Sequence, residues 1–289
     1  MTQPHHQMDK ILPESGSDSD GLIKTAGKAG FARAVQPIQA QTHILTSDKG
    51  LTAGWDRINT ASGELPVYYA KPACGSGSPV VLVVQEIFGV HEHIQDICRR
   101  LAGLGYFVLA PELFFRQGDP GKIDNITDIL QNIVAKVLDA QVFADLDVCI
   151  QWAEQQGGDI LRLGITGFCW GGRIVWLYAA HNACLKAAVA WYGRLTGHRD
   201  SITPENPIDI VSRLKAPVLG LYGGSDTGIL PGDIENMQIA LKDADSHSRI
   251  IVYPDMPHAF FADYRPTYRK LAAEDGWEKL KSWFMQHLR

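Results

Sequence analysis

The 289-residue sequence predicts an α/β fold: a doubly wound, mostly parallel sheet with an antiparallel edge at its N-terminal side. Two observations predict it. From residue 79 onward, short apolar runs alternate with segments of helical periodicity, which is typical of a buried parallel sheet covered by helices on both faces. Before residue 79, short alternating runs are separated by turn residues, which is typical of antiparallel hairpins.

The antiparallel edge is expected to contain three strands. THILT (42–46) and GLTAGWDRIN (50–59) flank the turn-forming residues SDKG, and LPVYYAKP (65–72) ends at Pro72. Proline carries no backbone N–H and therefore cannot continue a central strand. These runs predict a pair of hairpins at the edge of the sheet.

The remainder of the chain alternates strands with helices. A near-continuous apolar run such as PVVLVVQEI (79–87) is typical of a strand buried on both faces. Further strands are predicted at 106–113, 160–166, 185–193, 216–224 and 249–254, and helices at 93–105, 125–156, 172–182, 231–243 and 268–288. No repeat or linker interrupts this pattern, so residues 42–289 are expected to form a single domain.

Residues 1–41 differ in composition from the rest of the chain. They are polar and rich in Gly, Ser, Asp and Gln, and we expect them to form a flexible N-terminal tail. The stretch GFARAVQPIQAQ (30–41) has small residues typical of a signal-peptide cleavage site. However, no apolar core precedes it, and Arg33 interrupts the nearest candidate. The sequence therefore favours a soluble, cytoplasmic protein.

Composition excludes several classes of function. The net charge is −5, the pI is about 6.0, and no block of Lys and Arg occurs, so no nucleic-acid partner is expected. No apolar run approaches the ~20 residues of a membrane span, so no membrane association is expected. Neither does the sequence imply a cofactor. We expect a monomer or small homo-oligomer that acts on a small molecule.

The five cysteines do not form a redox or zinc motif. Their number is odd, their spacing is irregular, and no CxxC pair is present. Free thiols of this kind are typical of a reducing cytosol. His91 and His93 form HEH rather than HExxH, so no metal site is predicted.

One cysteine lies in a distinctive setting. GFCWGG (167–172) follows a predicted strand and precedes a predicted helix. With Cys169 in place of Ser, it matches the G-x-S-x-G nucleophile elbow of α/β-hydrolases. A helix N-terminus favours a thiolate because the free N–H groups and the helix dipole stabilise negative charge. A buried structural cysteine is the ordinary alternative, and the elbow context favours a nucleophile.

Two later loops supply candidate partners in the order that an elbow requires. Asp226 follows the strand APVLGLYGG, and His258 follows the strand RIIVYP. Both lie beyond the carboxyl ends of buried strands, where open α/β sheets place their sites. Asp226 alone could equally be a turn or cap residue. Together with Cys169, the three residues predict a nucleophile–His–acid triad.

The loop after the first buried strand predicts two further features. The N–H groups of Ile87 and Trp170 are the expected oxyanion-hole donors. Glu86 ends an apolar run, where a carboxylate needs a partner or a proton. A salt bridge to Arg99 or Arg116 would be the ordinary explanation for this glutamate.

The sequence resembles a known family. The blocks QEIFGV, APELFFRQ, GFCWGG and GGSD…PHAF match the dienelactone hydrolases (carboxymethylenebutenolidases) in order, from about residue 50 to the C-terminus. The resemblance implies an α/β-hydrolase fold and a Cys169–His258–Asp226 triad. It also implies that Glu86 contacts the resting thiol and helps to form the thiolate when substrate binds.

The resemblance further implies that Arg116 holds the substrate carboxylate and that Tyr192 lines the pocket. There are two departures from the family pattern. The serine that follows the family's catalytic histidine is Ala259 here, and a second carboxylate-binding arginine corresponds to Ala262. Arg265 lies nearby and is a candidate replacement.

The sequence therefore predicts a cysteine-dependent hydrolase of small carboxylic esters or unsaturated lactones that acts through an acyl-enzyme. Two alternatives remain open. One is a non-catalytic ligand-binding or sensing protein on a hydrolase scaffold, since fold does not dictate function. The other is redox chemistry at Cys169, with Cys184 as the resolving thiol.

Overall fold

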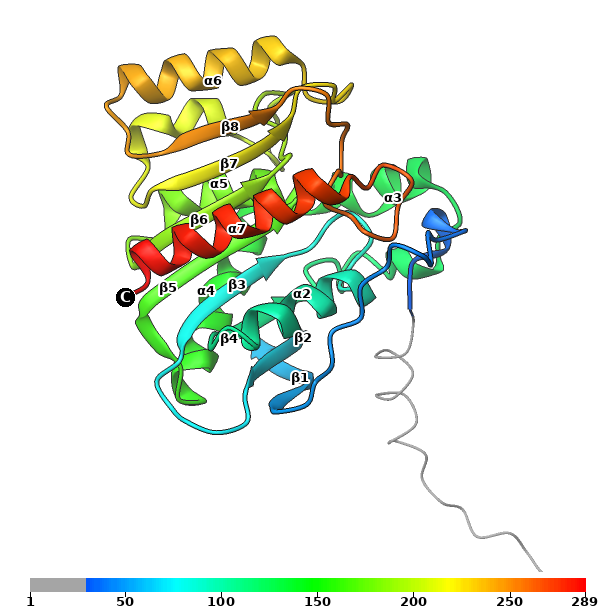
Figure 1. Ribbon diagram of the computed structural model, residues 1–289, viewed down its shortest axis with the longest axis vertical. Helices are drawn as coiled ribbons and strands as arrows, with labels where there is room; N and C mark the ends of the chain where they lie inside the picture. Colours follow the sequence, from blue (N-terminus) through cyan, green and yellow to red (C-terminus); the bar gives the residue numbers. More distant parts are fainter. Residues whose placement is uncertain (1–29) are drawn as a thin grey trace, which may run out of the picture.

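A single mixed sheet organises the chain. The computed structural model describes residues 30–289. Within them, eight strands form one sheet in the order β1-β2-β4-β3-β5-β6-β7-β8 (Figure 1). The strands are β1 (Leu51–Thr60), β2 (Gly63–Pro72), β3 (Pro79–Val84), β4 (Phe107–Pro111), β5 (Asp159–Phe168), β6 (Leu185–Trp191), β7 (Val218–Gly223) and β8 (Arg249–Tyr253).

The predicted fold class is confirmed. Strand β2 pairs antiparallel with both β1 and β4, whereas all pairings from β4 through β8 are parallel. The antiparallel edge is thus the N-terminal one. The parallel strands end together at one edge of the sheet, and the loops that follow them meet there.

Helices cover both faces of the sheet. Helices α2 and α7 lie in front of the sheet in Figure 1, and α4 and α5 lie behind it. The helices are α2 (Glu92–Ala102), α3 (Ile126–Asn132), α4 (Asp139–Gln155), α5 (Trp170–His181), α6 (Pro231–Asp243) and α7 (Lys270–His287), with 3-10 turns η1 (Arg33–Val35), η2 (Pro120–Lys122), η3 (Val134–Lys136) and η4 (Pro207–Arg213).

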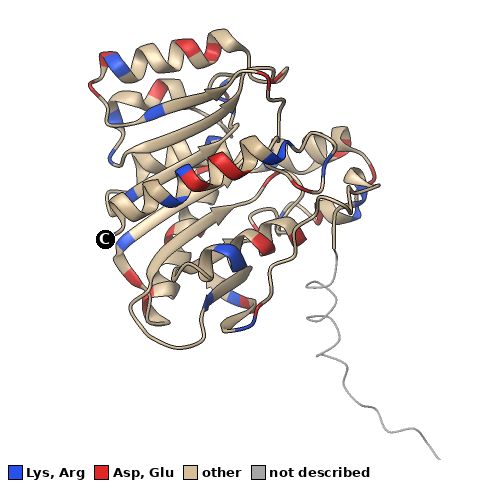
Figure 2. Ribbon diagram, viewed as in Figure 1, with Lys and Arg blue, Asp and Glu red and all other residues tan. Residues whose placement is uncertain are grey.

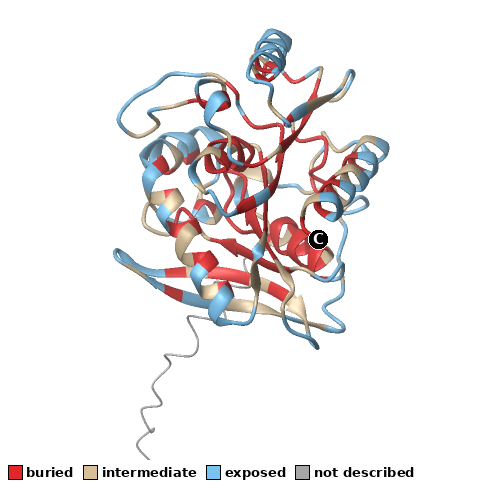
Figure 3. Ribbon diagram, turned by 90° about the vertical axis from the view of Figure 1, so that its left-hand side faces the viewer, coloured by how far each residue is buried: buried red, intermediate tan, exposed pale blue. Residues whose placement is uncertain are grey.

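Figure 3 shows buried residues concentrated along the centre of the sheet and on the inward sides of the helices. Every residue of β4 and β7 is buried, as expected for strands covered on both faces. Acidic and basic residues are interspersed on α7 (Figure 2), which places a mixed-charge face toward solvent. None of the helices within residues 30–289 is long and apolar enough to cross a membrane.

Residues 42–46 do not form the predicted strand. Instead of pairing with a neighbouring strand, two of their backbone N–H groups bond to side-chain carboxylates and two others bond to the Gln39 carbonyl. Ile44 donates to Asp263 Oδ2 at 3.3 Å, and Thr46 donates to Asp96 Oδ1 at 2.5 Å. The alternating pattern of THILT therefore reflects an extended segment that is fixed by carboxylates contributed from elsewhere in the chain.

The predicted helix over 125–156 is two helices, α3 and α4, joined by η3. The side chain of Asn125 caps the start of α3 by accepting the Asp128 N–H at 2.8 Å. Ile129, Ile133 and Val137 are all buried. The apolar spacing thus predicted which side chains are buried but not the break in the helix.

The predicted N-terminal tail, residues 1–41, falls only partly within the described residues; residues 1–29 lie outside them. The described part packs against the domain: the Phe31 ring stacks on Tyr264 with centroids 4.8 Å apart, and the Gln39 N–H donates to the Tyr264 carbonyl at 2.8 Å. Packing therefore begins before the predicted boundary at residue 42.

Candidate functional site

The candidate residues gather where β3, β5, β7 and β8 end. Glu86 and Ile87 follow β3, Cys169 follows β5, Asp226 lies beyond β7, and His258 lies beyond β8. This is the edge at which parallel α/β sheets place their sites.

Cys169 occupies a strained turn between β5 and α5. Its φ is 55° and ψ is −113°, a conformation that is uncommon for a residue with a side chain. It is the N-cap of α5 and is only half-buried. Strain at a nucleophile is a property of the elbow, where the turn projects the side chain away from the sheet.

Close backbone approaches explain the glycines of GFCWGG. A Cβ at Gly167 would lie 2.6 Å from the Gly171 carbonyl oxygen. A Cβ at Gly171 would lie 2.5 Å from the carbonyl oxygens of Val84 and Gln85, and one at Gly172 would lie 2.4 Å from that of Trp191. Helix α5 can therefore start directly against β3 and β6 only because these positions lack side chains.

The same principle brings Asp226 to His258. A Cβ at Gly223 would lie 2.2 Å from the Met256 carbonyl oxygen, and the Ser225 N–H donates to that oxygen at 3.0 Å. The backbones of the loops after β7 and β8 are thus hydrogen-bonded to each other. The loop segments that contain Asp226 and His258 therefore lie side by side.

Asp226 and His258 form a short hydrogen bond. His258 Nδ1 lies 2.6 Å from Asp226 Oδ2, while Asp226 Oδ1 accepts the N–H groups of Gly228 at 2.8 Å and Ile229 at 3.2 Å. Burial opposes the charged form of His258, but Cys169 and Asp226 together raise its pKa to about 10. The environment of the ring thus favours its charged form, the imidazolium.

The two expected oxyanion donors lie in the loop after β3 and at the start of α5. Trp170 is the first residue of α5, where an N–H has no partner within the helix. Ile87 lies in the loop after β3. Glu112 fixes this loop, because the Oε2 atom of Glu112 accepts the Val90 N–H at 2.8 Å. Within residues 30–289, neither the Ile87 nor the Trp170 N–H makes a turn or loop hydrogen bond.

Glu86 is 1% exposed and does not pair with Arg99 or Arg116, the partners considered from sequence. Its Oε2 accepts the Tyr264 hydroxyl at 2.6 Å and lies 3.4 Å from His91 Nε2. Burial alone would raise the pKa of Glu86, but His91, His93 and Arg265 outweigh it and lower the pKa to about 2. The thiol contact implied by the family resemblance is absent from the hydrogen bonds of the described residues.

Arg116 is placed differently from the expectation that it holds a substrate carboxylate. Its guanidinium donates to both oxygens of Asp145, at 2.7 and 2.9 Å, and to the hydroxyls of Ser62 and Thr60. The side chains of Arg116 and Asp145 are only 15% and 3% exposed. The charge is thus already paired, and this arginine joins the β1–β2 turn to α4.

Tyr192 packs against His258, and Arg265 lies close enough to Tyr192 to affect its pKa. The Tyr192 ring is fully buried and packs edge-on to His258, with centroids 5.2 Å apart. Burial, followed by the charges of Glu86 and Cys169, raises the pKa of its hydroxyl, while Arg265 lowers it. Arg265 is half-buried and lies over the Phe88 ring at 5.7 Å. Among the described residues its guanidinium has neither an ion-pair nor a hydrogen-bond partner.

The two positions that depart from the family pattern cannot bind an anion through a side chain. Ala259 and Ala262 are both completely buried, and Ala259 has a φ of 57°. Arg265 is three residues beyond Ala262 and acts on the pKa of Tyr192 and Glu86.

The histidines of HEH have partners other than a metal. His93 Nδ1 lies 2.9 Å from Asp263 Oδ1, and His91 lies against Glu86. Across residues 30–289, no three His, Cys, Asp or Glu side chains form a candidate metal-binding group.

Sequence reasoning missed Tyr264, His91 and Glu112. Tyr264 lies in the block HAFFADYRP, six residues after His258, and His91 belongs to the motif considered only for zinc. Glu112 lies in APELFFRQ, at the end of β4. A carboxylate directly after a buried strand was the signal used for Glu86, and the same signal identifies Glu112.

Comparisons with known proteins agree with this geometry. The model of the dienelactone hydrolase family matches residues 65–288. A Methylorubrum extorquens protein provisionally named a carboxymethylenebutenolidase is 55% identical over 267 residues, 92% of each chain. A similarly named Escherichia coli protein is 54% identical over 266 residues, which cover 92% of this chain and 98% of the relative.

A solved structure extends the agreement to three dimensions. The crystal structure of a protein provisionally named a dienelactone hydrolase, from Klebsiella pneumoniae, shares 53% sequence identity with a TM-score of 0.80. The match covers 82% of this chain and 99% of that one. The chain therefore belongs to the dienelactone hydrolase family and has its α/β-hydrolase fold.

Proposed function

We propose that the protein hydrolyses small carboxylic esters or unsaturated lactones, with Cys169 as the nucleophile and a covalent acyl-enzyme as the intermediate. The observation that carries the proposal is the arrangement at the elbow: a half-buried cysteine occupies a strained turn at a helix N-terminus and raises the pKa of His258, whose ring bonds to the buried carboxylate of Asp226. The names of the relatives point to the same class of substrate.

In the first step, the proton of the Cys169 thiol lies on the His258 ring, whose charged form the site favours, and the thiolate sulfur attacks the substrate carbonyl carbon. The carbonyl electron pair moves to oxygen, and the resulting oxyanion accepts hydrogen bonds from the backbone N–H groups of Ile87 and Trp170. The C–O bond then breaks, and the alkoxide leaving group takes the proton from His258. A thioester to Cys169 remains.

In the second step, His258 takes a proton from water as the water attacks the thioester carbonyl. The C–S bond breaks, the thiolate leaves, and the carboxylic acid product is released. Asp226 orients the ring throughout and stabilises its charged form. Glu86, a buried anion on the loop that carries Ile87, would control when the thiol loses its proton.

Substrate recognition is assigned to Arg265 and Tyr192. A half-buried guanidinium without a partner among the described residues is suited to a carboxylate. Tyr192 contributes a buried hydroxyl that has no hydrogen-bond partner within residues 30–289. Substrates that carry a carboxylate beside the ester or lactone should therefore be preferred.

The test is a hydrolysis screen of enol-lactones and activated esters, each with and without a carboxylate. Cys169→Ala should abolish turnover, whereas Cys184→Ala, at an exposed cysteine beyond the end of α5, should leave it unchanged. Rapid mixing should release one equivalent of alcohol before the steady state. Equal turnover by wild type and Cys169→Ala would refute the proposal, and ligand binding without product would favour the ligand-binding alternative.

The redox alternative has no support from the placement of the other cysteines. Cys184 lies beyond the C-terminal end of the 12-residue α5, whereas Cys169 lies at its N-terminus. A helix of that length separates the two thiols by roughly 18 Å, too far for a disulfide. Cys98 and Cys149 are buried in the core.

A further inference from the structure

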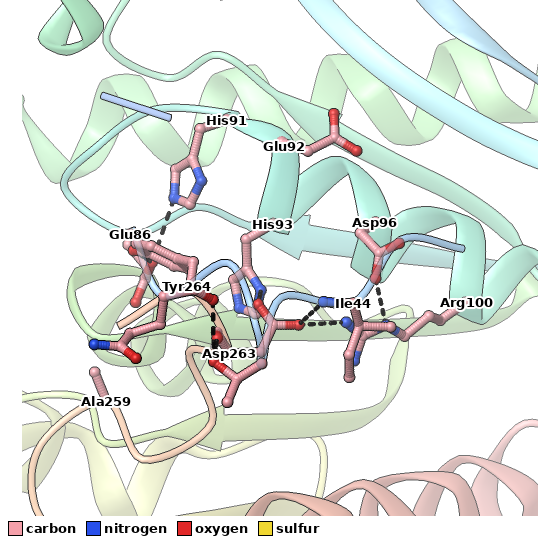
Figure 4. A network of polar contacts seen from close by, with 12 residues as sticks. Ile44, Glu86, His91, Glu92, His93, Asp96, Arg100, Ala259, Asp263 and Tyr264 are labelled. Carbon is pink, nitrogen blue, oxygen red and sulfur yellow. Dashed lines mark hydrogen bonds and ion pairs between the residues drawn. The ribbon is translucent and has the colours of Figure 1, made fainter. Parts of the chain in front are cut away.

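We propose that Tyr264 is a positioning residue that holds the Glu86 carboxylate at the active site, and that residues 31–46 hold Tyr264 in place from the outside. The inference rests on the proposed function, because Glu86 is given its role there. It assigns a purpose to a buried polar network that the triad does not use (Figure 4).

The contact between Tyr264 and Glu86 joins two parts of the site. Tyr264 belongs to the loop that carries His258, whereas Glu86 follows β3 on the loop that carries Ile87. The Tyr264 hydroxyl donates to Glu86 Oε2 at 2.6 Å, and both residues are at most 1% exposed. A hydrogen bond to a buried carboxylate is among the stronger polar contacts in a protein. This bond therefore fixes Glu86 relative to the His258 loop.

The carboxylate is held through one oxygen. His91 Nε2 approaches the same Oε2 at 3.4 Å, while the buried Oε1 has no hydrogen-bond partner within the described residues. The buried Tyr192 hydroxyl likewise lacks a partner there, and its pKa responds to Glu86 and to Cys169. Oε1 can thus accept a further hydrogen bond while Oε2 keeps its place.

The residue before Tyr264 is anchored by charge. Asp263 is 1% exposed; its Oδ1 lies 2.9 Å from His93 Nδ1, and its Oδ2 accepts Arg100 Nη2 at 2.8 Å (Figure 4). The Ile44 N–H donates to the same Oδ2 at 3.3 Å. Removing one member of such a buried set leaves an uncompensated charge, so the backbone at Asp263 has little freedom.

The N-terminal segment covers Tyr264 itself. Phe31 stacks on the Tyr264 ring with an interplanar angle of 28°, and its ring centroid lies 5.5 Å from that of His91. The Gln39 N–H donates to the Tyr264 carbonyl, and the Thr42 hydroxyl donates to the Asp263 carbonyl at 2.5 Å. The ring and both neighbouring carbonyls are therefore fixed, which leaves the hydroxyl aimed at Glu86.

The first experiment replaces Tyr264 with phenylalanine, which keeps the stacked ring and removes only the donor. We expect kcat to fall roughly ten- to a hundredfold, the range for loss of a charge-assisted hydrogen bond, with KM nearly unchanged. Tyr178→Phe is the matched control, because the buried Tyr178 hydroxyl also donates to a carboxylate, that of Asp147, at 2.6 Å and lies away from the site. A wild-type kcat for Tyr264→Phe would overturn the inference.

A second measurement separates positioning from mere structural support. The Tyr264 donor stabilises the charged form of Glu86, so its loss should move the titration of Glu86 to higher pH. Carbon-13 NMR of glutamate side-chain carboxylates follows this titration directly, and Glu86→Gln assigns the signal. Burial raises the pKa of Glu86, and His91, His93 and Arg265 lower it; the pKa of the neighbouring Tyr192 hydroxyl responds in turn to Glu86 and Cys169. An unchanged titration midpoint would contradict the proposal.

A double substitution tests whether Tyr264 acts through Glu86. If it does, Tyr264→Phe combined with Glu86→Gln should be no slower than Glu86→Gln alone. Independent, multiplying effects would overturn the inference. Should the wild type hydrolyse no ester or lactone, the proposed function fails, yet the NMR titration still decides whether Tyr264 holds Glu86. Wild-type turnover that is unaffected by Tyr264→Phe leaves the proposed function standing and removes only this inference.

Discussion

The two buried carboxylates of the site, Asp226 and Glu86, are held in opposite ways. Both oxygens of Asp226 are engaged, one by His258 and the other by two backbone N–H groups of its own loop. Glu86 uses one oxygen, which accepts the hydroxyl of Tyr264 from a distant part of the chain and lies near His91 of its own loop. A fully bonded carboxylate has a single stable orientation, whereas a half-bonded one can exchange partners. The difference suggests a fixed side and an adjustable side of the same site.

The largest expected effect breaks the fixed side. Asp226→Asn keeps the size of the side chain but removes the charge that stabilises the His258 imidazolium and selects its tautomer. We expect kcat to fall by about 10³–10⁴, as for similar changes in other triads. Steady-state hydrolysis of the best substrate from the screen measures this loss.

The same variant makes a prediction about pH. Burial lowers the pKa of His258, but Cys169 and Asp226 together raise it to about 10, so Asp226→Asn should lower that pKa. The charged ring would then be lost at lower pH than in wild type, and the basic limb of the pH–rate profile should shift in that direction. A profile identical to that of wild type would show that Asp226 does not set the charge of His258.

The different origins of these bonds explain what could be predicted from the sequence. Cys169, Asp226 and His258 each follow a strand of the parallel part of the sheet, and strand order alone carries them to one edge of the sheet. Local sequence patterns were therefore sufficient to predict where these three residues lie. Tyr264 bonds to Glu86 across 178 positions of sequence, and no local pattern encodes such a pairing.

The failures at the N-terminus have the same physical cause. THILT alternates like a strand, yet the backbone N–H groups of Ile44 and Thr46 bond to Asp263 and Asp96. The polar composition of residues 30–41 predicted a tail, yet Phe31 packs on Tyr264. In each case the deciding partner is a residue far along the chain, and tertiary contacts override the local tendency.

A smaller effect is expected at the adjustable side. Arg265→Gln removes a charge near Glu86 and Tyr192 while keeping a polar side chain of similar reach. For substrates with a carboxylate, KM should rise roughly ten- to a hundredfold, which corresponds to a lost charge-assisted contact. Esters without a carboxylate serve as the internal control and should show little change. Equal losses for both substrate sets would assign Arg265 a general structural role.

The smallest catalytic effect is expected at Arg116, although the family resemblance made it the first candidate for carboxylate binding. Its guanidinium is committed to Asp145 and to the β1–β2 turn. For Arg116→Ala we expect the ratio of kcat/KM between acidic and neutral substrates to stay within about twofold, because a paired charge offers little to a second anion. The free energy of unfolding, measured in urea, should fall by about 3 kcal/mol because Asp145 is left buried and unpaired.

Comparing the two arginines in one experiment sharpens the assignment. If Arg116 binds substrate, its variant should lose the preference for acidic substrates, and Arg265→Gln should not. If Arg116 is structural, replacing Asp145 by alanine in the Arg116→Ala background should recover part of the lost stability, because no unpaired carboxylate then remains in the interior. A selective KM defect in Arg116→Ala, with unfolding unchanged, would return this residue to the substrate pocket and place the carboxylate of the substrate on the side of β4.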